Sequence, residues 1–288
     1  MTTLKIDSIS KKYGKYMALD NISLSIEPGI FGLLGPNGAG KSTFMRILTA
    51  IQTLDSGSIE YGTVNWRNQL DVKRLIGYLP QKFSLYKHLT VMECLMHIAT
   101  MKGISKEKNA KVEYVLEQVN LLEHRNKKIG KLSGGMIRRV GIAQAILGEP
   151  QIIIVDEPTA GLDPEERIRF RNILHKIGQR NLIIISSHIV EDIETICGNI
   201  AILHKGKILA TGNVNSIRQS VNNLIRSAKV NPEELLSLEN KVKIIRQQPI
   251  ENQIYIRFLS EGDIEPNSEV EMPTLEDAYF YYMQSVGN

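Results

Sequence analysis

Cysteines and long apolar segments are both scarce in this chain. Its 288 residues include two cysteines, Cys94 and Cys197, which lie far apart and show no C-x-x-C spacing. We interpret them as buried free thiols of a reducing compartment, not as a disulfide or a metal site. The longest apolar runs, 152–155 and 182–185, have the length of strands, well short of the ~20 residues that cross a bilayer. Residues 1–5 lack the apolar core of a signal peptide, so we expect a cytoplasmic protein that meets a membrane only through a partner.

A strong excess of one charge is also missing. The 35 Lys and Arg residues nearly balance the 31 Asp and Glu residues, for a formal net charge of +4 at pH 7. This excess is too small to indicate nucleic-acid binding, and we expect no nucleic-acid partner. The chain is 42% hydrophobic and 23% charged, without repeats or low-complexity segments. This composition predicts an ordinary globular protein, large enough for one main domain and a smaller one.

What the chain does contain is a glycine-rich loop with the pattern G-x-x-x-x-G-K-[ST]. The apolar run 30–34 before it is typical of a strand, and 44–48 after it is typical of the start of a helix. Strand, loop and helix in this order are the context in which the pattern binds nucleotide phosphates. We predict that a nucleoside triphosphate is bound by Gly35, Pro36, Asn37, Gly38, Ala39, Gly40, Lys41, Ser42 and Thr43.

The residue types in this loop suit a triphosphate accompanied by magnesium. Glycines let the backbone curl so that several N–H groups point at the phosphates, and the helix that begins near Lys41 adds its positive end. The ammonium of Lys41 places a charge on the β- and γ-phosphates, and the hydroxyl of Ser42 is a ligand for Mg²⁺. The loop by itself does not indicate what the energy of the nucleotide is used for.

The hydrophobic pattern predicts an α/β fold with a phosphate-loop NTPase core. Residues 1–30 alternate as strands of an antiparallel β subdomain do. Continuous apolar runs that alternate with helices predict a mostly parallel sheet buried on both faces. A capping box at Thr90 opens a helical insertion over about 88–148. Asp163 caps a later helix that has Pro164 at its first position.

The character of the sequence changes after about residue 212. We therefore place the core domain at 1–212 and a small C-terminal α+β accessory domain, or appendix, at 213–288. Within the appendix, 213–230 is predicted to be a polar helix, 254–258 alternates as a strand, and 273–277 begins a last helix.

Further motifs follow the loop in a fixed order. Gln81 follows Tyr-Leu-Pro, a Leu-Ser-Gly-Gly-Met segment precedes a helix, and a buried strand ends in two carboxylates before Pro158. The residues concerned are Tyr13, Gln81, Ser133, Gly134, Gly135, Asp156, Glu157 and His188. Together with the loop they resemble the nucleotide-binding domain of ABC (ATP-binding cassette) ATPases, over roughly residues 4–212. The Leu-Ser-Gly-Gly signature is specific to this family among phosphate-loop proteins, although Met136 stands where many members have Gln or Glu.

The resemblance implies that ATP is the nucleotide and gives several side chains a role in its hydrolysis. Asp156, at the end of a buried strand, would hold Mg²⁺ together with Ser42 and Gln81. Glu157 would be the general base that orients and deprotonates the attacking water. His188 would hydrogen-bond the γ-phosphate and Glu157, and Gln81 would sense the γ-phosphate.

An aromatic ring is expected against the adenine. Tyr13 resembles the family's aromatic residue that stacks on this base, a contact between π faces. Tyr16 is a competing candidate because it lies close in the sequence.

The signature predicts a second anion site, at residues 133–135. Its glycines allow the backbone to approach a phosphate, and a helix begins there. In the family this signature meets the ATP of another subunit, which implies a head-to-tail dimer with a second copy of the chain or a paralogous ATPase. Asp163 would lie across that interface. Arg138 and Arg139, just beyond the signature, are interpreted as a solvated helix face.

The resemblance further implies a polytopic membrane permease as a partner. The region 82–101 follows Gln81, and its first part, residues 82–91, carries Phe83, Leu85 and Tyr86 where an exposed loop is expected. It is therefore a candidate docking surface for the permease, with local packing against the helical insertion as the alternative. The ATPase would then sit peripherally on the cytoplasmic face of the cell membrane, held by its permease.

Three functions are consistent with this resemblance. The first is an exporter subunit for drug, antibiotic-peptide or ion efflux, because the short appendix resembles exporter ATPases of the bacitracin/multidrug-resistance and sodium-efflux type. The second is an importer subunit, although sugar importers of the family usually have a longer β-rich appendix and a Leu-Ser-Gly-Gly-Gln signature. The third is a soluble ATPase without transport, although such members usually carry two cassettes, coiled coils or zinc cysteines. We expect an exporter, whose substrate would be chosen by the permease.

Overall fold

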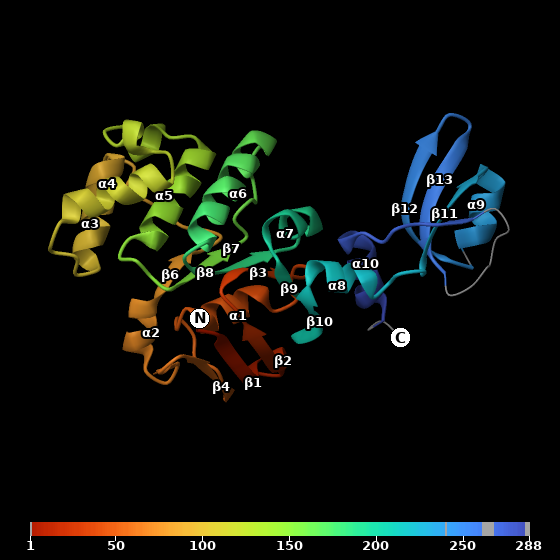
Figure 1. The fold of residues 1–288 in the computed structure, drawn as a ribbon, viewed down its shortest axis with the longest axis horizontal. Helices are drawn as coiled ribbons and strands as arrows, with labels where there is room; N and C mark the ends of the chain where they lie inside the picture. The colour runs from red at the N-terminus through yellow and green to blue at the C-terminus, as the bar shows by residue number, and fades with distance from the viewer. Residues whose placement is uncertain (1, 240, 261–267, 286–288) are drawn as a thin grey trace. The chain divides into compact units, whose positions relative to one another are not determined.

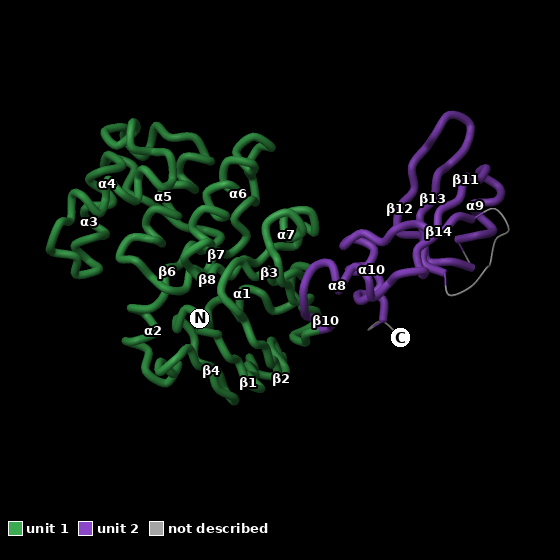
Figure 2. Tube along the Cα trace, viewed as in Figure 1, with its two compact units in different colours: residues 1–208 green, residues 209–288 purple. Residues whose placement is uncertain are grey.

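The computed structural model describes residues 2–239, 241–260 and 268–285, and it divides into two compact units (Figure 2). Unit 1 is residues 1–208 and unit 2 is residues 209–288. The domain boundary expected from the sequence, after residue 212, falls near the end of β10 (Lys207–Asn213). In the described part of the chain, every helix is too short or too polar to span a lipid bilayer.

The central sheet has six strands in the order β10-β9-β3-β8-β7-β6 (Figure 1), and unit 1 holds all of them except most of β10, whose residues run past the unit boundary. β3 pairs in parallel with β8 and β9, and β7 pairs in parallel with β8 and β6. This confirms the mostly parallel sheet. Every residue of β7 and β8 is buried, as in a sheet covered on both faces. The bounds are β3 (Gly29–Leu34), β6 (Ile76–Leu79), β7 (Ile152–Asp156), β8 (Leu182–Ser187) and β9 (Asn199–His204).

A second sheet, antiparallel and in the order β2-β1-β4-β5, confirms the predicted β subdomain. Between the two sheets lies α1 (Lys41–Leu48), and one continuous core joins Ile6 of β1, Phe44 of α1 and Ile154 of β7. Because α1 is fixed on both sides, so is the loop that leads into it. The bounds are β1 (Leu4–Tyr13), β2 (Tyr16–Ile26), β4 (Ser56–Tyr61) and β5 (Val64–Asn65).

The helical insertion lies between β6 and β7 and ends in α5 (Gly134–Ile146), which packs against β6. The capping box at Thr90 is confirmed, because its hydroxyl accepts from Glu93 N while the Glu93 carboxylate accepts from Thr90 N. The Asp163 cap is confirmed in the same way by a bond from Glu166 N. The other helices of unit 1 are α2 (Gln69–Leu75), α3 (Val91–Met101), α4 (Lys108–Gln118), α6 (Pro164–Gly178) and α7 (Val190–Ile196).

Unit 2 is a four-stranded sheet in the order β12-β13-β11-β14, with antiparallel neighbours. The expectation of one helix over 213–230 is wrong. The segment is helical only in α8 (Val214–Gln219) and then forms β11 (Ile225–Val230), whose residues pair with β13. Strand partners distant in sequence override the local helical pattern. The other bounds are α9 (Pro232–Glu239), β12 (Lys243–Ile250), β13 (Gln253–Leu259), β14 (Glu269–Val270) and α10 (Leu275–Gln284).

An ion pair joins β13 to α10 within unit 2. Arg257 Nε donates to Asp277 Oδ1 at 2.9 Å and Arg257 Nη2 donates to Asp277 Oδ2 at 2.7 Å. The Asp277 carboxylate also accepts from Thr274 N and so caps α10. Burial raises the pKa of Asp277, but the bonds from Arg257 and Thr274 outweigh it and hold the pKa below its ordinary value.

Candidate functional site

The phosphate loop runs from the end of β3 to the start of α1, in the predicted order of strand, loop and helix. Gly38 and Gly40 have φ values of +81° and +111°, in the left-handed region that favours glycine. A Cβ on Gly40 would also lie 2.5 Å from Ala18 O, and one on Gly35 would overlap Leu203 O. The loop therefore needs glycine both for its backbone angles and for its close packing against β2 and β9.

Lys41 is buried and folded over its own loop. Its ammonium donates to Gly35 O at 2.6 Å and to Pro36 O at 3.1 Å, and lies 3.5 Å from Glu157 Oε1. Burial lowers the pKa of Lys41, and the charge of Glu157 opposes this shift. The ammonium is therefore held at the loop by groups that a phosphate would have to replace.

The two predicted carboxylates stand at the end of β7, in different surroundings. Asp156 is buried and accepts a short hydrogen bond from the Ser186 hydroxyl of β8. Burial raises the pKa of Asp156, and the bond from Ser186 opposes this shift. Glu157 is the next residue and turns away from the strand, with φ +48°, while its N–H donates to Ser186 O and Oγ. The carboxylates of Asp156 and Glu157 therefore have different partners, although the two residues are adjacent in the sequence.

Glu157 is the centre of the cluster that the sequence motifs predict. Its Oε2 lies 2.8 Å from His188 Nδ1 and 3.5 Å from Gln81 Nε2, and its Oε1 faces Lys41. Gln81, Glu157 and His188 follow the carboxyl ends of β6, β7 and β8, and Lys41 is the first residue of α1, so the members of the cluster lie far apart in the sequence. The parallel sheet brings them together because the carboxyl ends of its strands lie at one edge.

A pocket of about 230 Å³ opens at this cluster and is the part of the site that fits a triphosphate. Lys41 and the start of α1 supply positive charge for phosphates. Ser42 and Gln81 line the pocket, whereas Asp156 is not among its lining residues. All three carry oxygen atoms of the kind that Mg²⁺ takes beside substrate phosphates, and no purely protein-built group of three His, Cys, Asp or Glu ligands occurs among the described residues. The lining residues are Tyr16, Ala18, Pro36, Asn37, Gly38, Gly40, Lys41, Ser42, Thr43, Gln81 and Glu157.

The two candidate tyrosines face different surroundings. Tyr16 lines the pocket, and its hydroxyl donates to Gly38 O at 3.2 Å. Tyr13 pairs with Tyr16 across the β1–β2 hairpin, is 42% exposed, and donates instead to Gln52 Oε1 at 2.6 Å. Tyr13 is not among the pocket-lining residues, so the structure brings Tyr16 to the phosphate loop while stacking by Tyr13 stays a prediction.

The signature lies at the start of α5 and does not line this pocket. Ser133 caps the helix by accepting from Met136 N at 3.2 Å. A Cβ on Gly134 would meet open space, whereas one on Gly135 would overlap the Glu166 carboxylate of α6. The exposed approach to Gly134 suits contact with a second molecule, as the resemblance implies.

Two arginines after the signature are placed differently from the expectation. Arg138 and Arg139 are 7% and 8% exposed, so their interpretation as a solvated face is wrong. Arg138 donates to the main-chain carbonyls of Gln81, Glu157 and Pro158. Arg139 donates to Asn120 O and faces the Glu166 carboxylate. The available signal was the apolar surroundings of the pair, since the rest of α5 reads as a helix buried all round.

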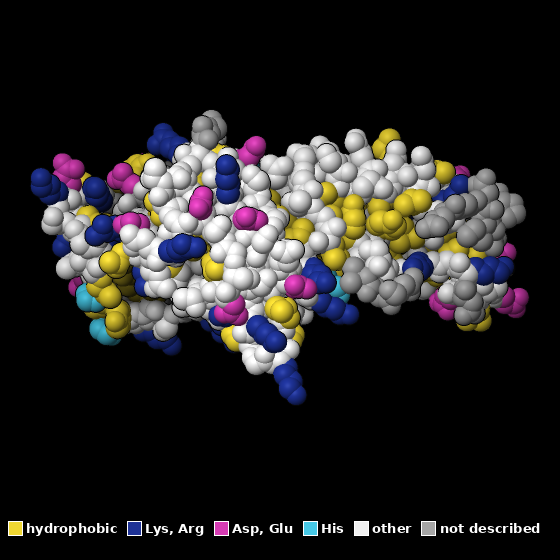
Figure 3. Space-filling view, turned by 90° about the horizontal axis from the view of Figure 1, so that it is seen from below, with side chains coloured by type: hydrophobic (Ala, Val, Ile, Leu, Met, Phe, Trp, Pro, Cys, Tyr) yellow, Lys and Arg dark blue, Asp and Glu magenta, His cyan; other side chains and the backbone are white. Residues whose placement is uncertain are grey.

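The candidate docking segment mixes exposed and half-buried aromatic side chains. Tyr86 is 54% exposed, and its ring meets those of His88 and His97 edge-on. Phe83 is half-buried beneath the Arg138 guanidinium, 5.9 Å from its ring centroid. Figure 3 shows hydrophobic side chains beside histidines at the α3 end of unit 1. The segment therefore presents part of its apolar surface to solvent and packs the rest.

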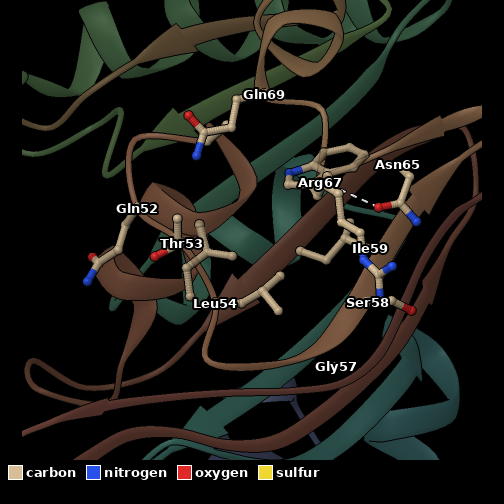
Figure 4. A pocket seen from close by; sticks show the side chains of 12 residues that line it. Gln52, Thr53, Leu54, Gly57, Ser58, Ile59, Asn65, Arg67 and Gln69 are labelled. Atoms are coloured by element: carbon tan, nitrogen blue, oxygen red, sulfur yellow. Dashed lines mark hydrogen bonds between the residues drawn. The ribbon is translucent and has the colours of Figure 1, made fainter.

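A second cavity, of about 200 Å³, lies beside the antiparallel sheet (Figure 4). Gln52, Asn65 and Arg67 line it, and it shares no residue with the phosphate-loop pocket. Trp66, the single tryptophan of the chain, also lines it, and its indole donates to Leu48 O at the end of α1. Trp66 is thus a natural fluorescent reporter beside the end of α1, the helix into which the phosphate loop leads.

Comparison with known proteins identifies a family model and sequence relatives that match this chain. The model of the ABC transporter family matches residues 19–160. The linearmycin resistance ATP-binding protein LnrL of Bacillus subtilis (strain 168) is 38% identical over 213 residues, 73% of this chain and 68% of that protein. The bacitracin transport ATP-binding protein BcrA of Bacillus licheniformis is 40% identical over 212 residues, 72% and 69% respectively. The methionine import ATP-binding protein MetN of Clostridioides difficile (strain 630) is 32% identical over 266 residues, 89% and 83%.

Solved structures agree with these relatives. The ADP conformation of MJ1267, an ATP-binding cassette of an ABC transporter, matches with a TM-score of 0.68 and 26% identity, over 74% of this chain and 91% of that one. The fold, the sequence relatives and the assembled phosphate-loop cluster therefore lead to one conclusion: the chain belongs to the ABC transporter family, as an ATP-binding subunit whose ATP hydrolysis is coupled to transport.

Proposed function

We propose that this subunit energises an exporter and that the substrate passes through a separate membrane permease. The observation that carries the proposal is the similarity, over the ATP-binding region, to proteins named for linearmycin resistance and bacitracin transport. The substrates of those two proteins are not assigned to this chain. For this chain the proposal covers only the class of drug, antibiotic-peptide or ion efflux.

For hydrolysis, we assign the general base to Glu157. Its Oε2 already holds the His188 ring at 2.8 Å, which fixes the direction of the carboxylate. His188 is 40% exposed and has room to contact the γ-phosphate from the other side of its ring. Gln81, at 3.5 Å from the same oxygen, would orient the attacking water together with Glu157. Lys41 would exchange its bonds to loop carbonyls for bonds to the β- and γ-phosphates.

Mg²⁺ would be held by Ser42, Gln81 and Asp156, and when bound it neutralises charge that develops on the phosphates. Asp156 is kept in place by Ser186, so its carboxylate has one direction available for this task. Gln81 connects the ion, the water and the docking segment, because residues 82–91 follow it directly. A tyrosine, Tyr13 or Tyr16, would stack on the adenine.

The second half of the proposed mechanism needs another ATPase subunit. Residues 133–135 lie outside the pocket of their own chain, which agrees with a head-to-tail dimer in which each signature closes on the ATP of its partner. That partner is a second copy of this chain or a paralogous subunit. ATP would close the dimer, and hydrolysis would open it.

The opening and closing would be passed to a polytopic permease through residues 82–91. The 54% exposed Tyr86 supports this role, because a large aromatic ring in solvent is typical of an interaction surface. This docking would hold the subunit on the cytoplasmic face of the cell membrane. No nucleic acid takes part in the proposed cycle.

An importer is the second candidate, and one observation favours it. The similarity to the methionine import protein MetN spans 89% of this chain, more than the 73% for LnrL or the 72% for BcrA. We retain the exporter because LnrL and BcrA are more similar residue by residue, at 38% and 40% identity against 32%.

The test is to purify the Glu157→Gln variant with ATP from detergent-solubilised membranes of the native source and to identify what accompanies it by mass spectrometry. A stoichiometric polytopic protein is expected. Vesicles containing that pair should then move substrate out of the compartment equivalent to the cytoplasm. Recovery of soluble partners alone would refute the transport assignment, and inward movement would select the importer.

A further inference from the structure

Arg138 is a buried arginine in the signature helix α5, and its hydrogen bonds go to main-chain carbonyls of two catalytic segments. Its Nη2 donates to Glu157 O at 2.7 Å and its Nη1 donates to Gln81 O at 2.9 Å. We infer that Arg138 is a positioning residue that holds Glu157 and Gln81 in fixed relation to the signature helix. The inference rests on the proposed role of Glu157 as the general base.

Arg138 fixes the backbone at Glu157 and Pro158, directly after β7. Besides Glu157 O, its Nε donates to Pro158 O at 3.0 Å, so the planar guanidinium binds two successive carbonyls. Glu157 has φ +48°, a left-handed angle that a non-glycine residue keeps only when its surroundings hold it there. These two hydrogen bonds from Arg138 fix the peptide that follows Glu157. The direction of the Glu157 carboxylate toward His188 is therefore fixed as well.

On the glutamine side, the same guanidinium fixes the start of the docking segment. Nη1 bonds Gln81 O, and the guanidinium lies over the Phe83 ring at 5.9 Å from its centroid. The side chains of Gln81 and Glu157 meet at 3.5 Å, so Arg138 holds both backbones of a pair that also touches through its side chains. A displacement of residues 82–91 by a bound partner would therefore reach Glu157 through Arg138.

The contacts of Arg138 with Gln81 and Glu157 depend on how closely α5 packs against β6. Gly141 lies three positions further along α5, on the same face. A Cβ at Gly141 would lie 2.6 Å from Leu79 Cδ1 and 2.6 Å from Phe83 Cζ. Only glycine therefore allows α5 to lie this close to β6, and the approach brings the Arg138 guanidinium to Gln81 and Glu157.

The neighbouring Arg139 provides a matched control. It is equally buried on the same helix, but it donates to Asn120 O and faces the Glu166 carboxylate at 3.5 Å. Arg139 thus ties α5 to other parts of unit 1, away from the proposed water-activating groups. Replacement of Arg139 by lysine removes its planar guanidinium and so tests how a general weakening of the packing of α5 affects ATP hydrolysis.

The first experiment measures ATP hydrolysis and ATP affinity for the purified full chain with Arg138→Lys, Arg138→Gln or Arg139→Lys. A lysine keeps the charge but cannot bond the separate carbonyls with a planar fork. Both Arg138 variants should lower kcat by about 30-fold or more, with Kd for ATP within about 3-fold of the unsubstituted chain. Arg139→Lys should keep kcat within about 3-fold, as expected for a residue outside the site. Unchanged kcat in Arg138→Lys would overturn the inference.

The second experiment places Arg138→Gln in the Glu157→Gln background. If Arg138 acts through Glu157, its loss should lower the residual rate by less than about 3-fold there, since the group it positions is already gone. An equal loss in both backgrounds would show an independent, merely structural effect. The two proposals fail separately: a Glu157→Gln variant at full rate removes the general base, whereas full-rate Arg138 variants beside an inactive Glu157→Gln remove only the role of Arg138.

Discussion

Replacement of Glu157 by glutamine should uncouple ATP binding from ATP hydrolysis. Glutamine has the same shape but cannot accept a proton from water. A positioned general base contributes about 10²–10⁴-fold, so we expect kcat to fall by about that factor, equivalent to about 3–5 kcal/mol of transition-state stabilisation.

The structure also gives the sign of the change in affinity. The Lys41 ammonium lies 3.5 Å from Glu157 Oε1, and both side chains are buried. At an effective dielectric constant of about 20 this attraction is about 5 kcal/mol before desolvation. Most of it is offset, because burying two charges is costly and Lys41 keeps its bonds to Gly35 O and Pro36 O. A net gain of about 1 kcal/mol for phosphates that no longer compete with the carboxylate corresponds to about 5-fold tighter ATP binding.

The assay is single-turnover hydrolysis of radiolabelled ATP, with affinity followed by the fluorescence of Trp66. Glu165→Gln is the matched control, because Glu165 is 75% exposed and pairs with Arg169 away from the site; it should change neither quantity. Hydrolysis by Glu157→Gln within about 3-fold of the unsubstituted rate, too small a loss for a general base, would refute the assignment. ATP binding that became weaker would refute the competition between Lys41 and Glu157.

Three further predictions concern the loop, the metal and unit 2. Gly40→Ala should destabilise the fold by about 1–3 kcal/mol and weaken ATP binding, because its Cβ would lie 2.5 Å from Ala18 O at φ +111°; thermal unfolding and fluorescence titration check this. Chelation of Mg²⁺ should abolish hydrolysis, and Asp156→Asn should raise the Mg²⁺ concentration for half-maximal rate by about 10-fold or more; an unchanged requirement would exclude Asp156 as a ligand. The pKa of Asp277 is held below its ordinary value, so its pairing with Arg257 stabilises unit 2 above about pH 4, and this stabilisation is lost as pH falls through the lowered pKa. Melting temperatures measured between about pH 6 and about pH 2.5 should therefore fall less steeply for Asp277→Asn than for the unsubstituted chain.

The core fold could be predicted from the sequence because its signals are local. The apolar runs that became β7 and β8 are buried on both faces and read as strands without knowledge of their partners. The caps at Thr90 and Asp163 are formed by side chains within one turn of the helix they start. The segment 213–230 failed for the opposite reason, since its second half became a strand only by pairing with β13.

The residues of the candidate site could be predicted from the sequence where they belong to recognisable motifs. Gln81, Glu157 and His188 could be named from their order along the chain, and the structure brings Gln81 and His188 each within hydrogen-bond reach of Glu157 Oε2. Arg138 could not be named, because its partners are main-chain carbonyls, which leave no mark in the sequence. Tyr13 was favoured over Tyr16 by its resemblance to the family's aromatic residue, and stacking by Tyr13 stays a prediction.

The sequence by itself determined the phosphate loop, the signature and the carboxylate pair, because each depends on residue types at fixed short spacing. It also determined that a parallel sheet would hold them, because buried strands need continuous apolar runs. Only the tertiary structure decided which carbonyls Arg138 bonds and that Tyr16 lines the pocket. Both depend on how closely elements distant in the sequence approach, and the close approach of α5 to β6 at Gly141 is a packing distance that local pattern does not contain.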